Sequence, residues 1–535
     1  MTFNKTAGVL ASLVLVGAAV TGAAMSRSDA GAATADSKQI STLTWGLTSG
    51  PRSLDLAHSM DINTLSVLSL GMESLLKIDQ HGKIVPNLAS SWSQPNKLTY
   101  VFNLRKGVKF WDGKPMTPAD VVYSFNRQLD PKTQSQDASF FSNMKAAVQS
   151  GPSQVTIHMK APDPTFIYMP ATYAFILEKA YALAKGKNLG TPSGGIMGTG
   201  AYTFSNFKPD EGITAKRNPN YWGAKPPIDT INFKFIAEDS TRLLALRSGQ
   251  IDGTFIIPLA QSKSWESIGN ASVLYAPGMN QDQFAFNFAV KPFDDVHVRR
   301  AFAYALDRSG LVKSLLRGHG EVAVGQAGPA QWAGKLTVPQ VRSFYQSIDG
   351  YPFSVEKARA ELKKSKYPNG FKATIKFADG FPETGQIAEN LAANLAKIGV
   401  KLSVVKTTTD AFIPTLFSHK GYGITIAQSQ PDYPDPWDYP AQYYASWNAI
   451  NGGLDFASYK NPAMDKLVKQ ESALPTTSPK RVALLEQAEK LMRRDLAYLP
   501  VFYMDSGMAV SKKFAFKNFD AIYASRDWAY NVQAK

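Results

Sequence analysis

Apolar side chains occupy every second position in several short stretches of the chain. In residues 98–104 (LTYVFNL) they stand at 98, 100, 102 and 104, and the spacing recurs at 155–159 (VTIHM) and 231–235 (INFKF). Successive side chains of a strand point to opposite faces, so this spacing is typical of a strand with one buried face. The pattern therefore predicts a strand in each of the three places.

Apolar side chains recur every three or four residues in other stretches, as on one face of a helix. Residues 117–120 (TPAD) have the form of a capping box with proline at the first helical position, and apolar residues follow on one face up to Leu129. A second apolar face at 387–398 ends at Gly399, a residue that favours the end of a helix. A third lies at 482–492. The sequence predicts a helix in each place.

The order of these elements predicts the fold class. A strand at 371–378, the helix at 387–398 and a strand at 400–405 would form a βαβ crossover. Strand and helix signals alternate elsewhere too, which favours an α/β fold. A chain of 535 residues is too long for one hydrophobic core, so we expect two α/β lobes, over roughly residues 36–280 and 281–505.

The N-terminal segment has the form of an export signal. Lys5 supplies a positive charge, residues 7–24 are apolar or small and uncharged, and small residues at 30–32 and 33–35 offer cleavage sites. The alternative is an uncleaved anchor helix, but the apolar stretch is shorter than the ~20 residues of a typical span. We expect a signal peptide at residues 1–35 and a mature protein outside the cytoplasm, in the periplasm or secreted.

Composition excludes several kinds of site. The chain has no cysteine, which excludes disulfides, thiolate metal ligands, cysteine nucleophiles and a lipid anchor on cysteine, so we do not expect a lipoprotein. The formal net charge is +15, yet no run of Lys or Arg is longer than two. We interpret this charge as dispersed over the surface and do not expect a nucleic-acid partner.

No catalytic or metal-binding motif stands out. The six histidines lack the spacing of metal ligands on one helix, so we expect neither a metal nor another cofactor. The tripeptide Gly198-Thr199-Gly200 lacks the remainder of a phosphate loop and is better explained as a tight turn. Carboxylates are plentiful, so a secreted hydrolase stays an alternative, although no catalytic group can be named.

One stretch combines features of a binding site. Residues 431–447 (PDYPDPWDYPAQYYASW) hold six aromatic residues, three aspartates and four prolines, and no Lys or Arg. Aromatic faces and carboxylates suit an ammonium group, and the same groups suit sugars, which stack on rings and donate hydroxyl protons. The structural alternative is a stiff surface loop whose rings pack inward.

Residues 86–128 contain an ordered set of motifs that is similar to the extracellular solute-binding proteins of the peptide/nickel class. The set comprises Pro-Asn-Leu-Ala-Ser-Ser-Trp at 86–92, Leu-Arg-Lys-Gly-Val-Lys-Phe at 104–110, Asp-Gly at 112–113 and a Thr-x-x-Asp-Val helix start at 117–121. Further matches follow in order along nearly the whole chain, at 54–55, 71–75, 198–202, 217–222, 247–252 and 286–308.

The resemblance implies a two-lobed periplasmic-binding-protein clamp with an extra subdomain in the first lobe. The implied limits are 36–58, 191–280 and 506–535 for the first lobe, 59–190 for its extra subdomain and 281–505 for the second lobe. Such proteins are not enzymes. They close on a small ligand about a hinge and deliver it to an ABC permease in the cytoplasmic membrane. We expect the two crossings between the lobes near 276–284 and 500–505, and a monomer.

The resemblance also implies a role for Asp432. In the oligopeptide-binding members, an aspartate in an Asp-Tyr-x-x-Pro segment pairs with the α-ammonium of the peptide, and residues 432–436 (DYPDP) match it. Those members carry Arg and Trp six and three residues earlier, where this chain has Ile426 and Ser429. Peptide is the leading ligand, and a carbohydrate or other non-peptide solute is the alternative. A sensory role would use the same closed lobes. The candidate ligand-binding residues are Asp432, Tyr433, Ser429, Trp437, Trp45, Phe284 and Tyr503.

Overall fold

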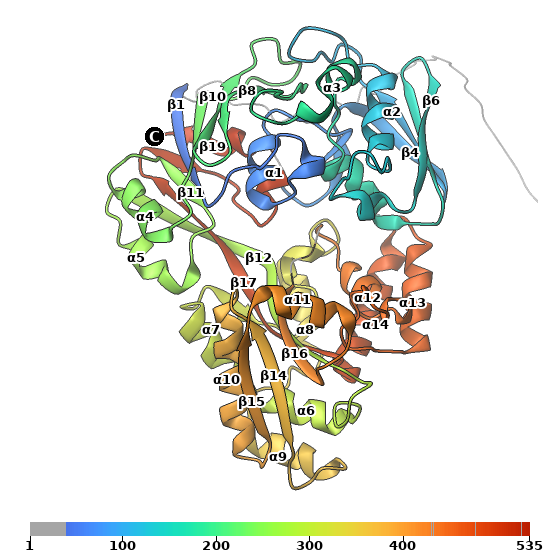
Figure 1. Ribbon diagram of the computed structural model, residues 1–535, viewed down its shortest axis with the longest axis vertical. Coiled ribbons are helices and arrows are strands. Elements are labelled where there is room, and N and C mark those ends of the chain that lie inside the picture. The colour runs from blue at the N-terminus through green and yellow to red at the C-terminus, as the bar shows by residue number, and fades with distance from the viewer. Residues whose placement is uncertain (1–38, 430, 432, 477, 526) are drawn as a thin grey trace, which may run out of the picture. The chain divides into compact units, whose positions relative to one another are not determined.

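A mixed sheet runs through both lobes of the protein (Figure 1). The computed structural model describes residues 39–535 apart from 430, 432, 477 and 526. The strand order is β16-β12-β17-β11-β1-β10-β9-β8, and β13 also pairs with β17. These strands are β1 (Ile40–Leu47), β8 (Tyr202–Lys208), β9 (Gly212–Arg217), β10 (Ile228–Phe235), β11 (Gly253–Phe255), β12 (Ala271–Phe286), β13 (Gly320–Val322), β16 (Ile424–Ser429) and β17 (Tyr498–Ser511).

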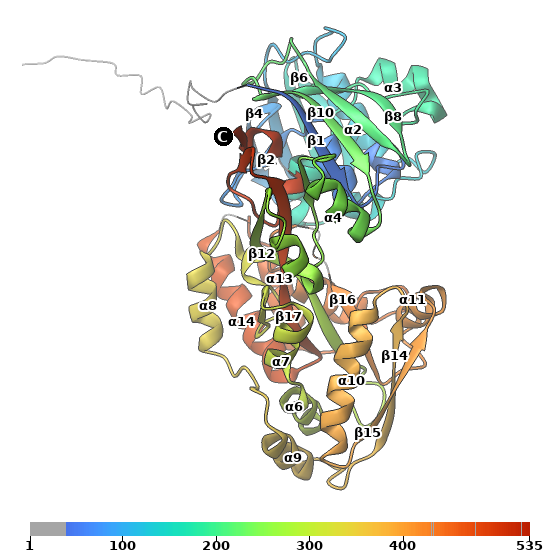
Figure 2. The same cartoon turned by 90° about the vertical axis from the view of Figure 1, so that its left-hand side faces the viewer.

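The strands β12 and β17 connect the lobes. They pair antiparallel along most of their length, with a register shift between Pro277 and Gln281, and Figures 1 and 2 show both running from one lobe to the other. The first lobe holds β1 to β11 with α1 (Ile62–Leu68) to α5 (Ser262–Glu266), and the second holds α6 (Val296–Ala305) to α14 (Pro479–Asp495). The predicted crossings at 276–284 and 500–505 lie within these two strands.

The strands expected from alternation are confirmed. Residues 98–104 give β5 (Thr99–Leu104), residues 155–159 give β7 (Gln154–Met159) and residues 231–235 fall in β10. In β5, Tyr100 and Phe102 are buried, as the spacing requires. β5 and β7 are the inner strands of a separate four-stranded sheet, whose outer strands are β4 (Ala89–Asn96) and β6 (Met144–Gly151).

The predicted capping box begins α2 (Pro118–Arg127). The Asp120 carboxylate accepts hydrogen bonds from the backbone N–H of Thr117 at 2.8 Å and from its hydroxyl at 2.6 Å. Val121 and Phe125 are buried on the inner face of the helix. At the other end, Arg127 forms an ion pair with Asp55. The helix therefore begins where the sequence predicts and packs through its apolar face.

The predicted βαβ crossover is also confirmed. The strands β14 (Lys372–Ala378) and β15 (Lys401–Thr407) are parallel, and α10 (Pro382–Ala396) connects them. Leu391 and Leu395 of α10 belong to the same buried core as Ile375 of β14. Gly399 ends the helix with φ +92°, a conformation that L side chains rarely adopt.

Hydrophobic cores cover both faces of the sheet in the second lobe. Phe284 and Phe286 of β12 point to a core that includes α6 and α10. Ala285, between them, points to a core with α13 (Pro462–Ser472), α14 and α12 (Asp438–Tyr443). Because successive side chains of a strand face opposite ways, a strand covered on both faces is buried at nearly every position.

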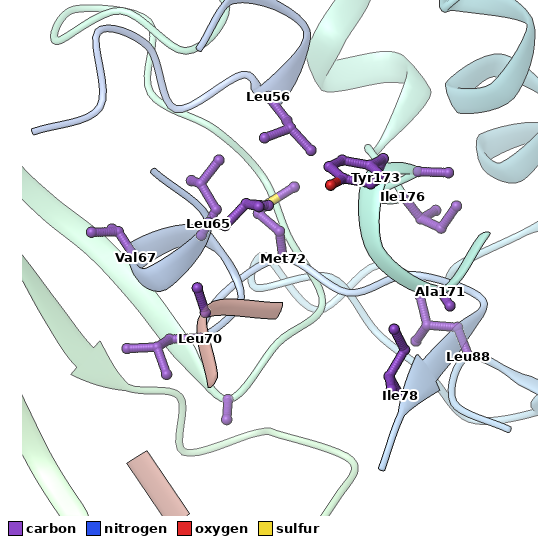
Figure 3. Packing of buried hydrophobic residues seen from close by; sticks show 14 of the residues in the cluster. Leu56, Leu65, Val67, Leu70, Met72, Ile78, Leu88, Ala171, Tyr173 and Ile176 are labelled. Carbon is purple, nitrogen blue, oxygen red and sulfur yellow. The ribbon is translucent and has the colours of Figure 1, made fainter. Parts of the chain in front are cut away.

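Residues far apart in the sequence build the core of the first lobe. Leu65 of α1, Met72, Ile78, Leu88 and Ile176 belong to one buried cluster (Figure 3). The C-terminal segment adds β18 (Phe514–Phe516), β19 (Val532–Ala534) and Trp528 to the same cluster. The Trp528 ring lies 5.1 Å from that of Trp45 in β1, centroid to centroid.

Three of the segments that match the family, 71–75, 198–202 and 217–222, meet at the buried carboxylate of Glu73. It accepts hydrogen bonds from the hydroxyl of Thr199 at 2.8 Å, the hydroxyl of Tyr221 at 3.0 Å and the indole N–H of Trp222 at 3.0 Å. Gly200 lies close to Gly71. A Cβ atom added to Gly200 would stand 2.6 Å from the backbone of Gly71. The hydrogen bonds to the Glu73 carboxylate therefore hold these three segments together inside the first lobe.

Candidate functional site

Three side chains form a row where the sheet leaves the second lobe. Gln281 of β12 is in register with Ser429 of β16 on one side and with Tyr503 of β17 on the other. The Tyr503 hydroxyl donates a hydrogen bond to the carbonyl of Gly325 at 2.7 Å, and the Ser429 hydroxyl donates to the Tyr439 hydroxyl at 3.1 Å. Two predicted site residues, Ser429 and Tyr503, are thus brought together from separate strands.

Gln281, the middle residue of the row, has an unused acceptor. Its side-chain N–H donates to the carbonyl of Gln326 at 2.8 Å. Its Oε1 is buried and has no hydrogen-bond donor among the described residues. An unpaired buried acceptor costs free energy, about 1–3 kcal/mol, unless a ligand or water supplies the donor. Gln281 is therefore a candidate contact that the sequence did not single out.

Two tyrosines join the lobes. Tyr168, in the short helix Pro164–Tyr168 of the first lobe, stacks on Tyr433 of the second, with ring centroids 4.9 Å apart and an interplanar angle of 6°. The Tyr168 hydroxyl lies 3.3 Å from the carbonyl oxygen of Pro434 and 3.3 Å from Asp435 Oδ2. The short helix is held at its start by Asp163, which accepts from the N–H groups of Thr165 and Phe166. This contact fastens the first lobe to residues 433–435.

Buried charges support the contact from the second lobe. Arg481 donates to both oxygens of Asp435, at 2.6 and 3.1 Å, and Lys335 Nζ lies 3.0 Å from Asp435 Oδ2. Arg481 also forms an ion pair with Glu471 at 2.9 Å. Lys335 further donates to the Tyr168 hydroxyl at 3.2 Å. We call Tyr168, Lys335, Asp435, Glu471 and Arg481 the interlobe cluster.

The electrostatics of the interlobe cluster follow from burial. Burial alone would raise the pKa of Asp435, but the charges of Arg481 and Lys335 overcome it and hold that pKa at about 2. Burial lowers the pKa of Lys335, and Asp435 opposes this. Burial raises the pKa of Glu471 well above its ordinary value, although Arg481 acts the other way. Asp435 is therefore an anion at neutral pH, held by two cations.

Two cavities lie between the same parts of the lobes. One, of about 610 Å³, includes Tyr168 and Lys335 in its wall. Its other lining residues are Gly82, Lys83, Ile84, Trp92, Ser93, Gln94, Tyr100, Pro164, Ile167, Ala333, Gly334, Pro475 and Thr476. We call it the lysine cavity, because Lys83 and Lys335 are its charged residues.

The second cavity, of about 600 Å³, is lined by Tyr433 and Trp437. Its other lining residues are Ser139, Phe140, Ser142, Asn143, Asp163, Thr165, Phe166, Met169, Gln442, Asn448, Gly452, Gly453 and Leu454. The indole N–H of Trp437 is buried without an acceptor among the described residues. We call this the amide cavity. It offers aromatic faces and amide groups to a guest.

The remaining predicted residues lie elsewhere. Asp432 is outside the described residues. Trp45 is 0% exposed and packs against Phe255 and Trp528, and Phe284 is 0% exposed inside the core of the second lobe. Both rings belong to hydrophobic cores, so neither is accessible to a ligand in this structure.

The sequence did not point to Tyr168, Lys335 or Gln281. Tyr168 and Lys335 are 167 residues apart, and neither lies in the stretch 431–447 that the sequence singled out. Gln281 lies in the expected crossing at 276–284. Its polar side chain at a crossing between the lobes is the feature of the sequence that could have indicated a ligand contact. Among the residues that the structure describes, no group of three or more His, Asp or Glu side chains is placed to hold a metal ion.

Residues 83–451 match the family model described as bacterial extracellular solute-binding proteins, family 5, middle. The chain belongs to this family. Its members bind peptides and related ligands for import by ABC transporters, and the chain is accordingly a solute-binding protein of such a system. Within the described ranges, none of the helices has the length and apolar character of a membrane span.

Curated relatives cover most of the chain. Heme-binding protein A of Haemophilus influenzae is 28% identical over 454 residues, which are 78% of each chain. The glutathione-binding protein GsiB of Escherichia coli is 27% identical over 470 residues, which are 84% of this chain and 86% of the relative. These relatives are binding proteins rather than enzymes.

Solved structures share the two-lobed fold. DppA of Helicobacter pylori, in complex with the peptide STSA, matches with a TM-score of 0.74 and 24% identity, over 93% of this chain and 99% of that one. HbpA2 of Haemophilus parasuis matches with a TM-score of 0.80 and 22% identity, over 92% of this chain and 100% of that one. The two-lobed α/β architecture expected from the sequence is confirmed.

Proposed function

We propose that this protein captures a small peptide between its lobes, outside the cytoplasm, and delivers it to an ABC permease in the cytoplasmic membrane. The observation that carries the proposal is the interface between the lobes, where Tyr433 and Trp437 line a cavity of about 600 Å³ together with first-lobe residues. A site whose walls come from two lobes can bind and release its ligand as the lobes close and open.

The chemistry of the interface supports a peptide. Gln281 offers a buried acceptor and Trp437 a buried donor, which are the two kinds of group that a peptide backbone needs. Ser429 and Tyr503 flank Gln281, and Asp432 remains the candidate partner of the peptide ammonium. Similarity to DppA in complex with STSA, and to a protein named for binding glutathione, itself a small peptide, adds support.

A carbohydrate is the second candidate, and the amide cavity favours it. The rings of Phe140, Phe166, Tyr433 and Trp437 lie beside the amides of Asn143, Gln442 and Asn448, and neither Lys nor Arg lines the cavity. Rings that stack on the apolar face of a sugar, with amides that bind its hydroxyls, suit a neutral saccharide.

Two measurements test the ligand class. Native mass spectrometry of the purified protein identifies any carried-over ligand. Calorimetry then compares trialanine, N-acetyl-trialanine, cellotetraose and haemin. We expect trialanine to bind and its acetylated form to bind far more weakly. Binding of cellotetraose or haemin alone would refute the peptide proposal.

Asp432 is tested by the same pair of peptides. Asp432→Asn should weaken binding of trialanine by about 2–5 kcal/mol, the range for truncating one partner of a buried charge pair. Acetylation should then cost the variant little further affinity, and Asp438→Asn should have a much smaller effect. Equal losses on acetylation in both proteins would show that Asp432 does not hold the ammonium.

We also propose the processing, location, oligomeric state and domain limits that the sequence predicts. The signal peptide at 1–35 is removed, and the mature protein is a periplasmic or secreted monomer without a lipid anchor or catalytic activity. The domain limits are those given above: 36–58, 191–280 and 506–535 for the first lobe, 59–190 for its subdomain and 281–505 for the second lobe. N-terminal sequencing and light scattering of the mature protein test the first two statements.

A further inference from the structure

One face of the parallel pair β14–β15 is open except at its end, where α11 (Thr409–Ser418) packs near Ala378 and lines a small cavity together with Lys376. The inner face of the pair, with Ile375 and Leu402, packs in the core with α10, as Figure 2 shows from the side. Six alternate residues of the opposite face are exposed. They are Lys372, Thr374 and Lys376 of β14 and their direct register partners in β15, Lys401, Ser403 and Val405. Three lysines and two hydroxyls therefore share one exposed surface, which we call the basic face.

The three lysines of the basic face do not stabilise the fold. Lys372 and Lys401 are direct neighbours on adjacent strands, and like charges in that position are destabilising. None of the three lysines of the basic face has a carboxylate within 4.0 Å among the described residues. The repulsion is thus not compensated within the described part of the chain, and a negatively charged partner would relieve it.

Protection of an exposed strand edge explains only part of the pattern. Lysine on an outer strand discourages pairing with other chains. β14 and β15 form a two-stranded sheet, and because the other side of β14 lies against β16, the free edge is that of β15. That accounts for Lys401. It does not account for Lys372 and Lys376, because β14 lies between β15 and β16. Two of the three charges therefore need another explanation.

The surroundings strengthen the positive charge. Residues 355–407 contain ten Lys or Arg and five Asp or Glu, so this segment carries a net charge of +5. Helix α9 (Val355–Lys364) ends with Lys363 and Lys364, near the end of the lobe where β14 begins (Figure 1). A face of this kind binds negative charge over an area, because its cations stand side by side on two strands rather than around one pocket.

We propose that the basic face docks the protein on the surface of an anionic phospholipid bilayer. Each lysine contributes Coulomb attraction to the lipid phosphates, and the hydroxyls of Thr374 and Ser403, between the lysines, donate hydrogen bonds to phosphate oxygens. The interaction does not involve the cavities between the lobes, so it does not depend on which ligand the protein carries. It would hold the protein near the membrane in which its permease lies.

Vesicle co-sedimentation tests this proposal with the mature protein. The vesicles are an equal mixture of phosphatidylglycerol and phosphatidylcholine, or phosphatidylcholine alone. We expect binding to the anionic vesicles only, and its loss at high salt, because the Debye length falls to about 3 Å at 1 M. The triple variant K372E/K376E/K401E should bind about 100-fold more weakly, from about fivefold for each lysine.

The matched control is K106E/K132E/K187E, which removes three exposed lysines of the first lobe and changes the net charge equally. It should keep more than half of the wild-type affinity, and thermal unfolding verifies that both variants fold. An equal loss in the two triple variants would show that total charge, not the basic face, governs binding. Failure of the wild type to bind anionic vesicles at low salt would also overturn the proposal.

Discussion

The ring of Tyr168 lies flat on the ring of Tyr433, with centroids 4.9 Å apart, and these two residues belong to different lobes. The stack separates the lysine cavity, which Tyr168 lines, from the amide cavity, which Tyr433 lines. It joins the two lobes in this structure and contributes one ring to the wall of each cavity.

Removing the Tyr168 ring should shift the protein toward the open form. An aromatic pair contributes about 0.5–1.5 kcal/mol beyond its buried area, and the hydroxyl adds bonds to Lys335 and Asp435. We expect Tyr168→Ala to weaken ligand binding by about 1–3 kcal/mol and Tyr168→Phe by about 1 kcal/mol. Calorimetry measures the affinity, and small-angle scattering measures the radius of gyration with and without ligand.

Tyr181 provides the control for this experiment. Its hydroxyl also donates a hydrogen bond, to the carbonyl of Gly194 at 2.7 Å, but within the first lobe. Tyr181→Ala should leave affinity nearly unchanged. If both alanine variants lose affinity equally, the Tyr168 contact has no special part in closure.

Gly82 marks a second point where the lobes touch. A Cβ atom at Gly82 would stand 2.4 Å from the Cβ of Ala333, and one at Gly334 would stand 2.7 Å from the carbonyl oxygen of Gly82. We expect Gly82→Ala to hold the lobes apart and weaken ligand binding at least tenfold, about 1.4 kcal/mol. Calorimetry with the best ligand of the panel measures this loss.

Gly107→Ala separates this effect from backbone strain. Gly82 and Gly107 have φ of +77° and +80°, but a Cβ at Gly107 would meet nothing within 4 Å. Both variants should lose about 1–2 kcal/mol of unfolding free energy. Only Gly82→Ala should lose affinity, and a similar loss in Gly107→Ala would rule out a steric block of closure.

Asp435→Asn should destabilise the folded protein strongly. The substitution leaves Lys335 buried without its anion and Arg481 with Glu471 as its remaining acidic partner, and breaking such a buried pair costs about 3–5 kcal/mol. Urea unfolding measures the change in unfolding free energy. The exposed Asp210→Asn serves as the control and should change it by less than about 0.5 kcal/mol. A loss below 1 kcal/mol in Asp435→Asn would contradict the charge assignment.

Stability should fall as the pH rises through neutrality. Burial and the nearby charge of Asp527 raise the pKa of Glu73 to about 7, whereas an unfolded glutamate has a pKa of about 4.3. The folded state therefore binds the proton more tightly, and this stabilisation is present below about pH 4 and lost as the pH passes about 7. The full effect is up to about 4 kcal/mol.

Glu73→Gln isolates this contribution. The unfolding free energy of the variant should depend less on pH between 4.5 and 8 than that of the wild type. Part of the dependence should remain, because burial also raises the pKa of Glu489 to about 7. The exposed Glu389→Gln should leave the slope unchanged. Identical slopes for Glu73→Gln and the wild type would refute the assignment.

Local periodicity predicted the elements well, because a helix or strand with one buried face repeats its apolar positions. The capping box at Thr117 and the glycine at Gly399 set helix ends within one to three residues of those in the structure. The chain order of strand, helix and strand at 371–405 also predicted the parallel pairing, since a short connection permits few topologies.

The site was harder to predict, because it depends on contacts between distant segments. Tyr168 and Asp435 are 267 residues apart, and nothing local to Tyr168 indicates that its ring meets Tyr433. The candidate residues Trp45 and Phe284 are both enclosed in hydrophobic cores. Sequence alone does not say which side of a strand a later segment will cover.

The packing of Trp45 on Trp528 has a consequence for the order of events during biosynthesis. The ribosome makes Trp45 early and Trp528 almost last, so the core that contains both is incomplete until nearly the whole chain exists. The cores of the second lobe, whose buried residues lie between 284 and 503, can close before that. The lobe that is begun first is therefore finished last.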